Sequence, residues 1–451
     1  MIRVSTLTAL GVVLALGACS KPAFPPEQQQ GANPQLPAAQ QFLFPPMNIT
    51  TPVGWKDGEA PTVPAGFTIT ALGTDMKGPR NVVALANGDV LAVEGGGPGG
   101  EPVTRPKDLI YGIVKGRAHS PVKAGNRVVL LRDANGDGRA EQQIVLIDNL
   151  HSPFGIVQVG DALYVAETDR IMRYAFTPGQ TRLTGPGTVL TDLPAGEINH
   201  HWTKSLTASP DGTKLYVGIG SNSNIVERGI IAEQDRARIW EVDVATGATR
   251  PYATGLRNPN GLTFEPVSGK LWAVINERDE LGNNLVPDYM TSVQDGAFYG
   301  WPWSYYGDHV DVRVAPRRPD MVAKAIAPDY SLGSHVAPLG LAFNTGASFP
   351  ARYAGGAFIG EHGSWDRTVP SGYQVAFVPF ASGRPAGKVE TFVGGFLDAD
   401  NHTRGRPVGV AFDRTGALLI ADDVGNAVWR VSARAAPAAV ATPPATTAAQ
   451  R

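Results

Sequence analysis

Short runs of β-forming residues alternate with tight turns along most of the chain. In a typical unit, an apolar strand over residues 79–83 is followed by a turn at 87–89 and a second strand at 90–93. Alternating apolar positions bounded by Gly, Asn or Asp are typical of a β-hairpin. The 3.6-residue period of an amphipathic helix is hard to find, so the pattern predicts an all-β fold.

The hairpin unit recurs six times, with one or two further strand-like runs between copies. Its first strands lie at residues 79–83, 153–156, 205–208, 260–264, 339–343 and 408–412. A regular repeat of about four strands is typical of a propeller blade. We therefore expect a six-bladed β-propeller with four-stranded blades over residues 65–434, closed by an outer strand at residues 67–71. The alternative, two stacked β-sandwiches, would not need this self-similarity.

Both ends of the chain lie outside the repeat. Residues 19–64 are rich in Gln, Pro and Ala, and residues 435–451 in Ala, Pro and Thr. Segments of this composition bury too little apolar surface to order themselves, which predicts a disordered tether and a disordered tail. The net charge of −2 argues against nucleic acid as a partner, because binding to phosphates relies on an excess of basic residues.

Residues 1–18 have the pattern of a secretory signal peptide. Arg3 precedes an apolar run over residues 7–16, which is too short to span a bilayer. The run ends in LGAC, which resembles the bacterial lipobox and predicts a lipidated Cys19; a chance cleavage site is the alternative. Because Ser20 rather than an aspartate follows, we expect a lipid anchor on the periplasmic face of the outer membrane. Cys19 is the only cysteine, so no thiol remains for disulfide or metal chemistry.

Polar residues gather where each blade begins. One precedes or opens the first strand of every copy: Arg80, His151, His201, Arg257, His335 and Arg406. The loops that leave the second strands open on the same face and carry Glu94, Glu167 with Asp169, Ser221 with Asn222, residues 276–279, Glu361 with His362, and Asp422 with Asp423. Arginines suit an anionic ligand and histidines exchange protons near neutral pH. We expect a site at this mouth, with Arg80 tying adjacent blades to the acidic loops.

Several motifs follow one another in order along the propeller. They are LRNPNGL at 256–262, NERD at 276–279, PDY at 287–289, YGWP at 299–302, HGSWDR at 362–367 and RGR at 404–406. In this order they resemble the soluble aldose (glucose or sorbosone) dehydrogenase family, close to its pyranose dehydrogenase branch. The resemblance implies a six-bladed propeller that oxidises a sugar at C1 with pyrroloquinoline quinone (PQQ) and Ca²⁺.

The resemblance also implies roles for individual residues. His201 matches the general base, and Arg257 matches the arginine beside the reacting quinone carbonyl. The residues matched to cofactor binding are Arg404, Arg406, His362, Arg367, Ser221 and Asn222. Within this set, His362 or Arg367 stands nearest to the family's lysine, and Ser221 replaces the aspartate that orients the base in glucose dehydrogenases. The backbone of Glu277, Arg278 and Asp279 matches the calcium-binding segment.

Two further features refine these expectations. The sequence DANGDG at 133–138 begins like a calcium loop, but Ile144 stands where an EF-hand needs glutamate. We interpret it as a polar hairpin turn, with a structural calcium site as the alternative. No Cys-x-x-Cys-His motif occurs, so electrons would leave to an external quinone or cytochrome.

The main alternative function is a calcium-dependent lactonase or esterase on the same fold. Glu94, Asn222, Asn276 and Glu361 could supply its metal ligands. That interpretation leaves Arg257, Arg404 and Arg406 without a function. A propeller that only binds a ligand is the third possibility, and fold analogy does not separate the three.

The predicted lipid anchor has a direct test. We expect Cys19→Ala to move the protein from the membrane fraction to the soluble fraction, because the acyl chains would be its only membrane attachment. Fractionation followed by immunoblotting measures this, and a variant that still pellets with membranes contradicts the lipobox.

Overall fold

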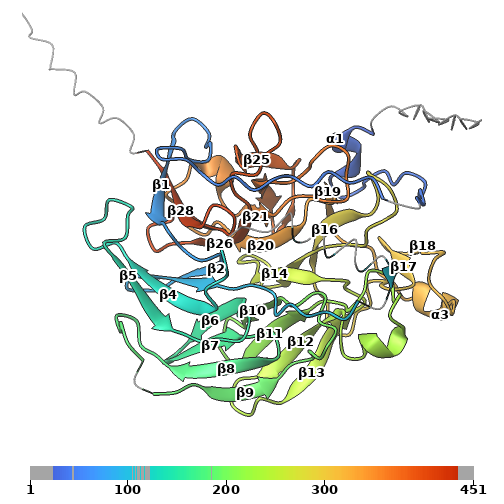
Figure 1. Ribbon diagram of the computed structural model, residues 1–451, viewed down its shortest axis with the longest axis horizontal. Coiled ribbons are helices and arrows are strands. Elements are labelled where there is room, and N and C mark those ends of the chain that lie inside the picture. Colours follow the sequence, from blue (N-terminus) through green and yellow to red (C-terminus); the bar gives the residue numbers. More distant parts are fainter. Residues whose placement is uncertain are drawn as a thin grey trace, which may run out of the picture.

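The computed structural model describes residues 24–42, 45–103, 105, 106, 108, 112, 116, 122–183 and 185–434. The predicted signal peptide, Cys19 and the C-terminal tail lie outside these residues. The described chain forms six four-stranded antiparallel sheets arranged as the blades of a propeller (Figure 1). The innermost strands contact one another in a closed ring. The six-bladed all-β prediction is confirmed, and the alternative of two stacked sandwiches is wrong.

Five blades are consecutive in sequence and the sixth joins the two ends of the fold. From the channel outwards, the first three blades are β2 (Pro79–Ala84), β3 (Val90–Glu94), β4 (Arg127–Arg132), β5 (Gln142–Ile147); β6 (Gly155–Val159), β7 (Ala162–Ala166), β8 (Arg170–Ala175), β9 (Thr188–Asp192); and β10 (Lys204–Ala208), β11 (Lys214–Ile219), β12 (Arg238–Asp243), β13 (Thr249–Thr254). The others are β14 (Pro259–Phe264), β15 (Leu271–Ile275), β16 (Pro287–Ser292), β19 (Tyr330–Ser334); β20 (Pro338–Phe343), β21 (Ala357–Glu361), β22 (Gln374–Val378), β25 (Glu390–Val393); and β26 (Pro407–Phe412), β27 (Leu418–Asp422), β28 (Ala427–Ala433), β1 (Phe67–Gly73).

Short helical turns and two-residue strands lie in the loops between the blade strands. They are the helical turns α1 (Pro26–Gln29) and α3 (Pro319–Val322), the 3₁₀ turns Ile230–Glu233 and Ala351–Tyr353, and the short strands β17 (Ser304–Tyr305), β18 (His309–Val310), β23 (Phe380–Ala381) and β24 (Arg384–Pro385). Among the described residues, no helix has the length and apolar character needed to cross a membrane.

The second strand of a blade is covered on both faces by neighbouring blades. Every residue of β3, β7, β15, β21 and β27 is buried. This explains why these strands are almost uninterrupted apolar runs. Near the axis the blades crowd together, and a Cβ at Gly340 or Gly360 would lie 2.2 or 2.0 Å from the carbonyl oxygen of Val408.

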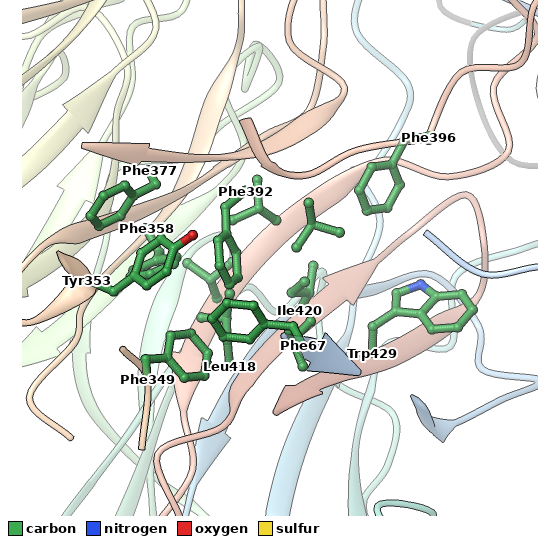
Figure 2. Packing of buried hydrophobic residues seen from close by; sticks show 14 of the residues in the cluster. Phe67, Phe349, Tyr353, Phe358, Phe377, Phe392, Phe396, Leu418, Ile420 and Trp429 are labelled. Carbon is green, nitrogen blue, oxygen red and sulfur yellow. The ribbon is translucent and has the colours of Figure 1, made fainter. Parts of the chain in front are cut away.

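The ring closes by pairing strands from the two ends of the fold. Strand β1 lies antiparallel to β28, with Phe67 opposite Ala433, as predicted for residues 67–71. The Phe67 ring packs against Phe349, Tyr353 and Phe392 at centroid distances of 4.8, 5.5 and 5.1 Å (Figure 2). The closing strand therefore also completes the aromatic core between the last two blades.

The structure departs from the predicted disordered tether between residues 24 and 64. Gly31 pairs with Ser331, Pro52 with Thr403 and Thr62 with Gly394. Within the segment, Gln29 and Thr50 are buried. Composition measures what a segment can bury by itself, whereas this one gains its order from the surface of the blades.

The DANGDG sequence forms the predicted hairpin turn between β4 and β5, and the calcium alternative stays a prediction. The Asp133 carboxylate accepts the amides of Gly136 and Gly138 at 2.7 and 2.8 Å. Asp133, Asp137 and Glu141 each offer an oxygen within 4.8 Å of the other two. The acids thus stabilise the turn by local hydrogen bonds.

Removing the closing aromatic ring should destabilise the whole propeller. We expect Phe67→Ala to lower the free energy of unfolding by about 3–5 kcal/mol, because it opens a cavity in a packed aromatic cluster. Denaturant unfolding measures this. Thr68→Ala, at the neighbouring exposed position, should cost less than about 1 kcal/mol, and equal losses in both variants would contradict the closure role.

Candidate active site

The segments that enter the inner strands meet those that leave the second strands at one end of each blade. Backbone pairing shows this directly, with the pairs Pro79–Glu94, Lys204–Ile219, Pro259–Ile275, Pro338–Glu361 and Pro407–Asp422. The predicted ring of polar residues therefore lies at one mouth of the channel. His151 is its exposed member: 54% of the side chain is accessible and Nδ1 lies 3.1 Å from Asp169.

His201 lies on the loop before β10 and its ring is held by the loop after β11. Its Nδ1 is 2.7 Å from the carbonyl oxygen of Ser221 and 3.1 Å from the Ser221 hydroxyl. Because a carbonyl only accepts, Nδ1 carries the proton and Nε2 keeps its lone pair. Burial, with the nearby charge of Arg257, holds the pKa of His201 well below its usual range. The imidazole is therefore neutral, and its unprotonated Nε2 is the atom that can accept a proton.

A buried polar network that the sequence did not reveal supports this loop. Arg236, 3% exposed, donates to the carbonyl oxygens of His201 at 3.0 Å and Gly220 at 2.9 Å. The fully buried Lys204 donates to the carbonyl of Trp202 at 3.1 Å. Together they fix the positions of both loops that define the base. The sequence feature that could have indicated this network is Lys204, a lysine at the start of an inner strand.

Arg257 occupies the next position around the mouth. Its guanidinium donates to the carbonyl oxygen of Glu277 at 2.5 Å, to Asn224 Oδ1 at 3.0 Å and to the Asp279 carboxylate at 3.1 Å. Its charge contributes to the low pKa of His201. The structure thus brings His201 and Arg257 together, and the protein's own acceptors hold the arginine in place.

Of the three residues predicted to hold the metal, only Asp279 offers a side chain to the site. Glu277 and Arg278 form a fully buried ion pair at 3.0 Å, so their charged groups satisfy each other inside the protein. The carbonyl oxygens of Glu277 and Asp279 accept hydrogen bonds from Arg257 at 2.5 Å and Arg313 at 3.1 Å. Two of the three expected backbone ligands are therefore engaged by arginines.

Asp279 belongs instead to a compact cluster with His335 and Asp366. One ligand atom of each lies within 4.8 Å of the other two. Asp366 is fully buried, and its Oδ1 has no partner among the described residues. Burial and the charge of Asp279 raise the pKa of Asp366 to about 7. Burial lowers the pKa of His335, but the hydrogen bond and the charge of Asp279 raise it, and the net shift of the His335 pKa is upward. Asp366 was missed as a site residue although it lies in the HGSWDR motif.

Arg80, His362 and Asp423 form a second group across the mouth. Arg80 Nη1 lies 2.5 Å and His362 Nε2 3.0 Å from the same carboxylate oxygen of Asp423. Because Arg80 belongs to the first blade and Asp423 to the last, the predicted blade-tying role of Arg80 is confirmed. Burial lowers the pKa of His362 to about 4, so its ring is neutral at pH 7. The Arg80 guanidinium also lies 5.4 Å from the Trp202 ring, next to His201.

Arg406 has no carboxylate within ion-pair distance among the described residues. Its side chain is buried, and Nη2 contacts only the hydroxyl groups of Thr50 and Tyr373, each at 3.3 Å. Its Nε is buried and without a partner in the described part of the chain. A buried guanidinium is costly unless an anion compensates it. This geometry is that of a site for an anionic ligand.

The remaining predicted cofactor residues bind protein groups. The contacts are Arg404 Nη2 to Glu59 at 3.9 Å, Arg367 Nη1 to the Ser334 carbonyl at 3.2 Å, Asn222 Nδ2 to the Ala232 carbonyl at 2.7 Å and Ser221 Oγ to the Ser223 carbonyl at 2.6 Å. Burial lowers the pKa of Arg367. Arg404 and Arg406 therefore have different surroundings, and of the two only Arg406 is buried and has no carboxylate within ion-pair distance in the described part of the chain.

Buried acids at the ends of the second strands serve the backbone. Each accepts an amide from the segment that enters an inner strand; the pairs are Glu94 with Lys77 at 2.8 Å, Glu167 with His151 at 2.9 Å and Asp422 with Arg406 at 2.7 Å. Such carboxylates brace the mouth loops instead of facing a ligand.

The same bracing weakens the lactonase alternative. Glu94 forms an ion pair with Arg127 at 2.5 Å, and Asn276 donates to the carbonyl of Pro338 at 2.7 Å. Neither Glu94 nor Glu361 belongs to any cluster of described carboxylates and imidazoles that could hold a metal. Two of the four residues that this alternative needs, Glu94 and Asn276, are therefore engaged by other protein groups.

The fold and the site define the class of the protein. Residues 122–294 and 318–434 match the TrAA12-like family, and the chain belongs to it. Among particular relatives, a pyrroloquinoline quinone-dependent sugar dehydrogenase of Hypocrea jecorina is 22% identical over 375 residues, 71% of this chain and 84% of that protein. An uncharacterized protein of Borreliella burgdorferi is 30% identical over 292 residues, 62% of this chain and 76% of that one.

Solved structures show the same fold. The PQQ domain of pyranose dehydrogenase from Coprinopsis cinerea, in its holo form, matches with a TM-score of 0.67 at 18% identity, covering 85% of this chain and 100% of that domain. A family AA12 carbohydrate-active enzyme of Trichoderma reesei matches with a TM-score of 0.67 at 20% identity, covering 86% and 99%. The family resemblance found in the sequence is thus confirmed.

Proposed function

We propose that the protein is a PQQ-dependent oxidoreductase that oxidises an aldose or a related pyranose at C1. The observation that carries this proposal is Arg406, a buried cation with an unpartnered Nε and no carboxylate of its own. A guanidinium in this state fits the carboxylates of PQQ, which it can bind through paired hydrogen bonds. The names of the relatives in fungi support the same cofactor.

The chain supplies the proton-transfer groups. His201 presents a neutral Nε2, fixed by the carbonyl of Ser221, which can accept the C1 hydroxyl proton of a sugar. Arg257, close enough to lower the pKa of His201, can stabilise negative charge that develops beside the base. PQQ, when bound, supplies the two-electron acceptor for the hydride. The electrons would then pass to an external quinone or cytochrome.

The residues present also fit a divalent cation. Asp279 and the fully buried Asp366 supply carboxylate oxygens, and the unpartnered Oδ1 of Asp366 is free to act as a ligand. Oxygen ligands of this type suit Ca²⁺, which acts as a Lewis acid in such sites. We propose that calcium binds here, beside Arg257.

A titration tests the cofactor and the base together. We expect the purified protein to bind PQQ stoichiometrically in the presence of Ca²⁺ and to reduce a dye when aldoses are added. His201→Ala should retain PQQ binding while lowering the rate by about a hundredfold or more, as for loss of a general base. Absorbance and dye reduction measure both. A protein that binds no PQQ refutes the proposed cofactor, and an unchanged rate in His201→Ala removes that residue from the mechanism.

The protonation state of His201 predicts the pH dependence. Because its pKa is lowered, the base stays neutral as the pH falls through 6.5, and activity should be lost only at more acidic pH. Ser221→Asp would place a carboxylate beside the ring, raise this pKa and shift the acidic limb of kcat/KM to higher pH. Ser221→Asn is the uncharged control, and an acidic limb at the same pH in all three proteins would contradict this assignment.

A further inference from the structure

Residues 45–56, here called the N-terminal strap, lie beside the loops that carry the predicted cofactor residues Arg406 and Arg367. Pro52 of the strap pairs with Thr403 in a parallel β-bridge. The Val53 amide donates to the carbonyl of Thr403, and the Thr403 amide donates to the carbonyl of Thr51, both at 2.8 Å. At its other end, Asn48 Nδ2 donates to the carbonyl of Thr368 at 3.1 Å. The strap therefore joins the loop before β26 to the loop after β21.

Thr50 lies where these two loops meet Arg406. Its side chain is 2% exposed, and its hydroxyl lies 3.2 Å from the Tyr373 hydroxyl and within hydrogen-bond distance of Thr403 Oγ1. The same hydroxyl accepts a hydrogen bond from Arg406 Nη2 at 3.3 Å. The guanidinium also lies 5.2 Å from the ring of Tyr373. The strap thus provides one of the few groups that orient this cation.

Trp55 holds the backbone of the same arginine indirectly. Its Nε1 donates to Asp422 Oδ2 at 2.8 Å, and Asp422 Oδ1 accepts the amide of Arg406 at 2.7 Å. The indole packs edge-on against Phe396 and Trp429 at 5.7 and 5.5 Å. The strap therefore reaches both the side chain and the main chain of Arg406.

We propose that the strap is a wall of the anion site and that Thr50 is a positioning residue for Arg406. A fixed hydroxyl acceptor holds one edge of the guanidinium, which orients its remaining N–H groups for a ligand carboxylate. The strap lies outside the residues that match the family. The identity of the anion as PQQ rests on the proposed function.

Binding measurements separate Thr50 from the rest of the strap. We expect Thr50→Val, which keeps the shape and removes the hydroxyl, to weaken PQQ binding about tenfold, as for loss of a hydrogen bond to a charged group. The kcat at saturating PQQ should stay within about twofold, since His201 is untouched. Thr50→Ser should restore binding.

Thr51→Val is the matched control, because this neighbouring side chain is exposed and only its backbone pairs with Thr403. It should bind PQQ as the unaltered protein does. Unchanged binding in Thr50→Val, or equal weakening in both valine variants, overturns the positioning role.

Hydrogen exchange of the protein without PQQ tests the strap independently of the cofactor. The amides of Val53 and Thr403 should be protected, because both lie in the strap pairing. Thr50→Val should speed exchange at residues 403–406, whereas Thr51→Val should not. Fast exchange of these amides in the unaltered protein refutes the strap. If the strap is protected but no PQQ binds, the proposed cofactor fails and the strap stands.

Discussion

A propeller blade has two apolar faces and no core of its own, so every part of this structure depends on closure of the ring. The ring closes where β1 pairs with β28. This pairing places Phe67 opposite Ala433, two residues from opposite ends of the propeller sequence. Until they pair, the faces of the first and last blades remain exposed to water, at about 25 cal/mol per Å² of apolar surface. The aromatic cluster around Phe67 concentrates this stabilisation at the joint.

Closure of the ring also determines where the N-terminal segment lies. Because β1 is the outer strand of the sixth blade, the residues that precede it in the chain start beside the last two blades. From there the segment before residue 64 pairs with Gly394 and Thr403, on the loop that leads to Arg406. The constraint that completes the core thus brings the N-terminal segment to the part of the mouth that carries Arg406.

Charge around the mouth is mostly balanced within the protein. Arg80 is paired with Asp423, Arg257 with Asp279 and Arg278 with Glu277. Such pairs offset the cost of burying charge but leave little affinity for a ligand. Arg406 differs because hydroxyl groups are its only hydrogen-bond partners among the described residues. Arg406 is therefore the arginine that the proposed function assigns to an anionic ligand.

The sequence predicted the blades, the closing strand and the mouth because these follow from local alternation and repetition. His201, Arg257 and Arg406 could be placed at the mouth because each stands shortly before a repeated strand, and the family resemblance implied their roles. The side chains that support them could not, since Arg236 and Thr50 act through contacts distant in sequence. The burial of Arg278 could not be predicted for a related reason. Its partners Ser304 and Asp311 lie in a different part of the chain, which no local pattern connects to it.

The use of Ser221 to orient His201 has a chemical consequence. A backbone carbonyl fixes the imidazole tautomer as firmly as a carboxylate does, because both accept the Nδ1 proton. A carboxylate would in addition stabilise the imidazolium, by the Coulomb term that raises a histidine pKa. Without it, and with Arg257 nearby, the protonated ring is disfavoured. The free energy of protonating His201 is then unfavourable unless negative charge develops near Arg257 in the same step. In the proposed reaction, this would favour transfer of the proton and the hydride in one step.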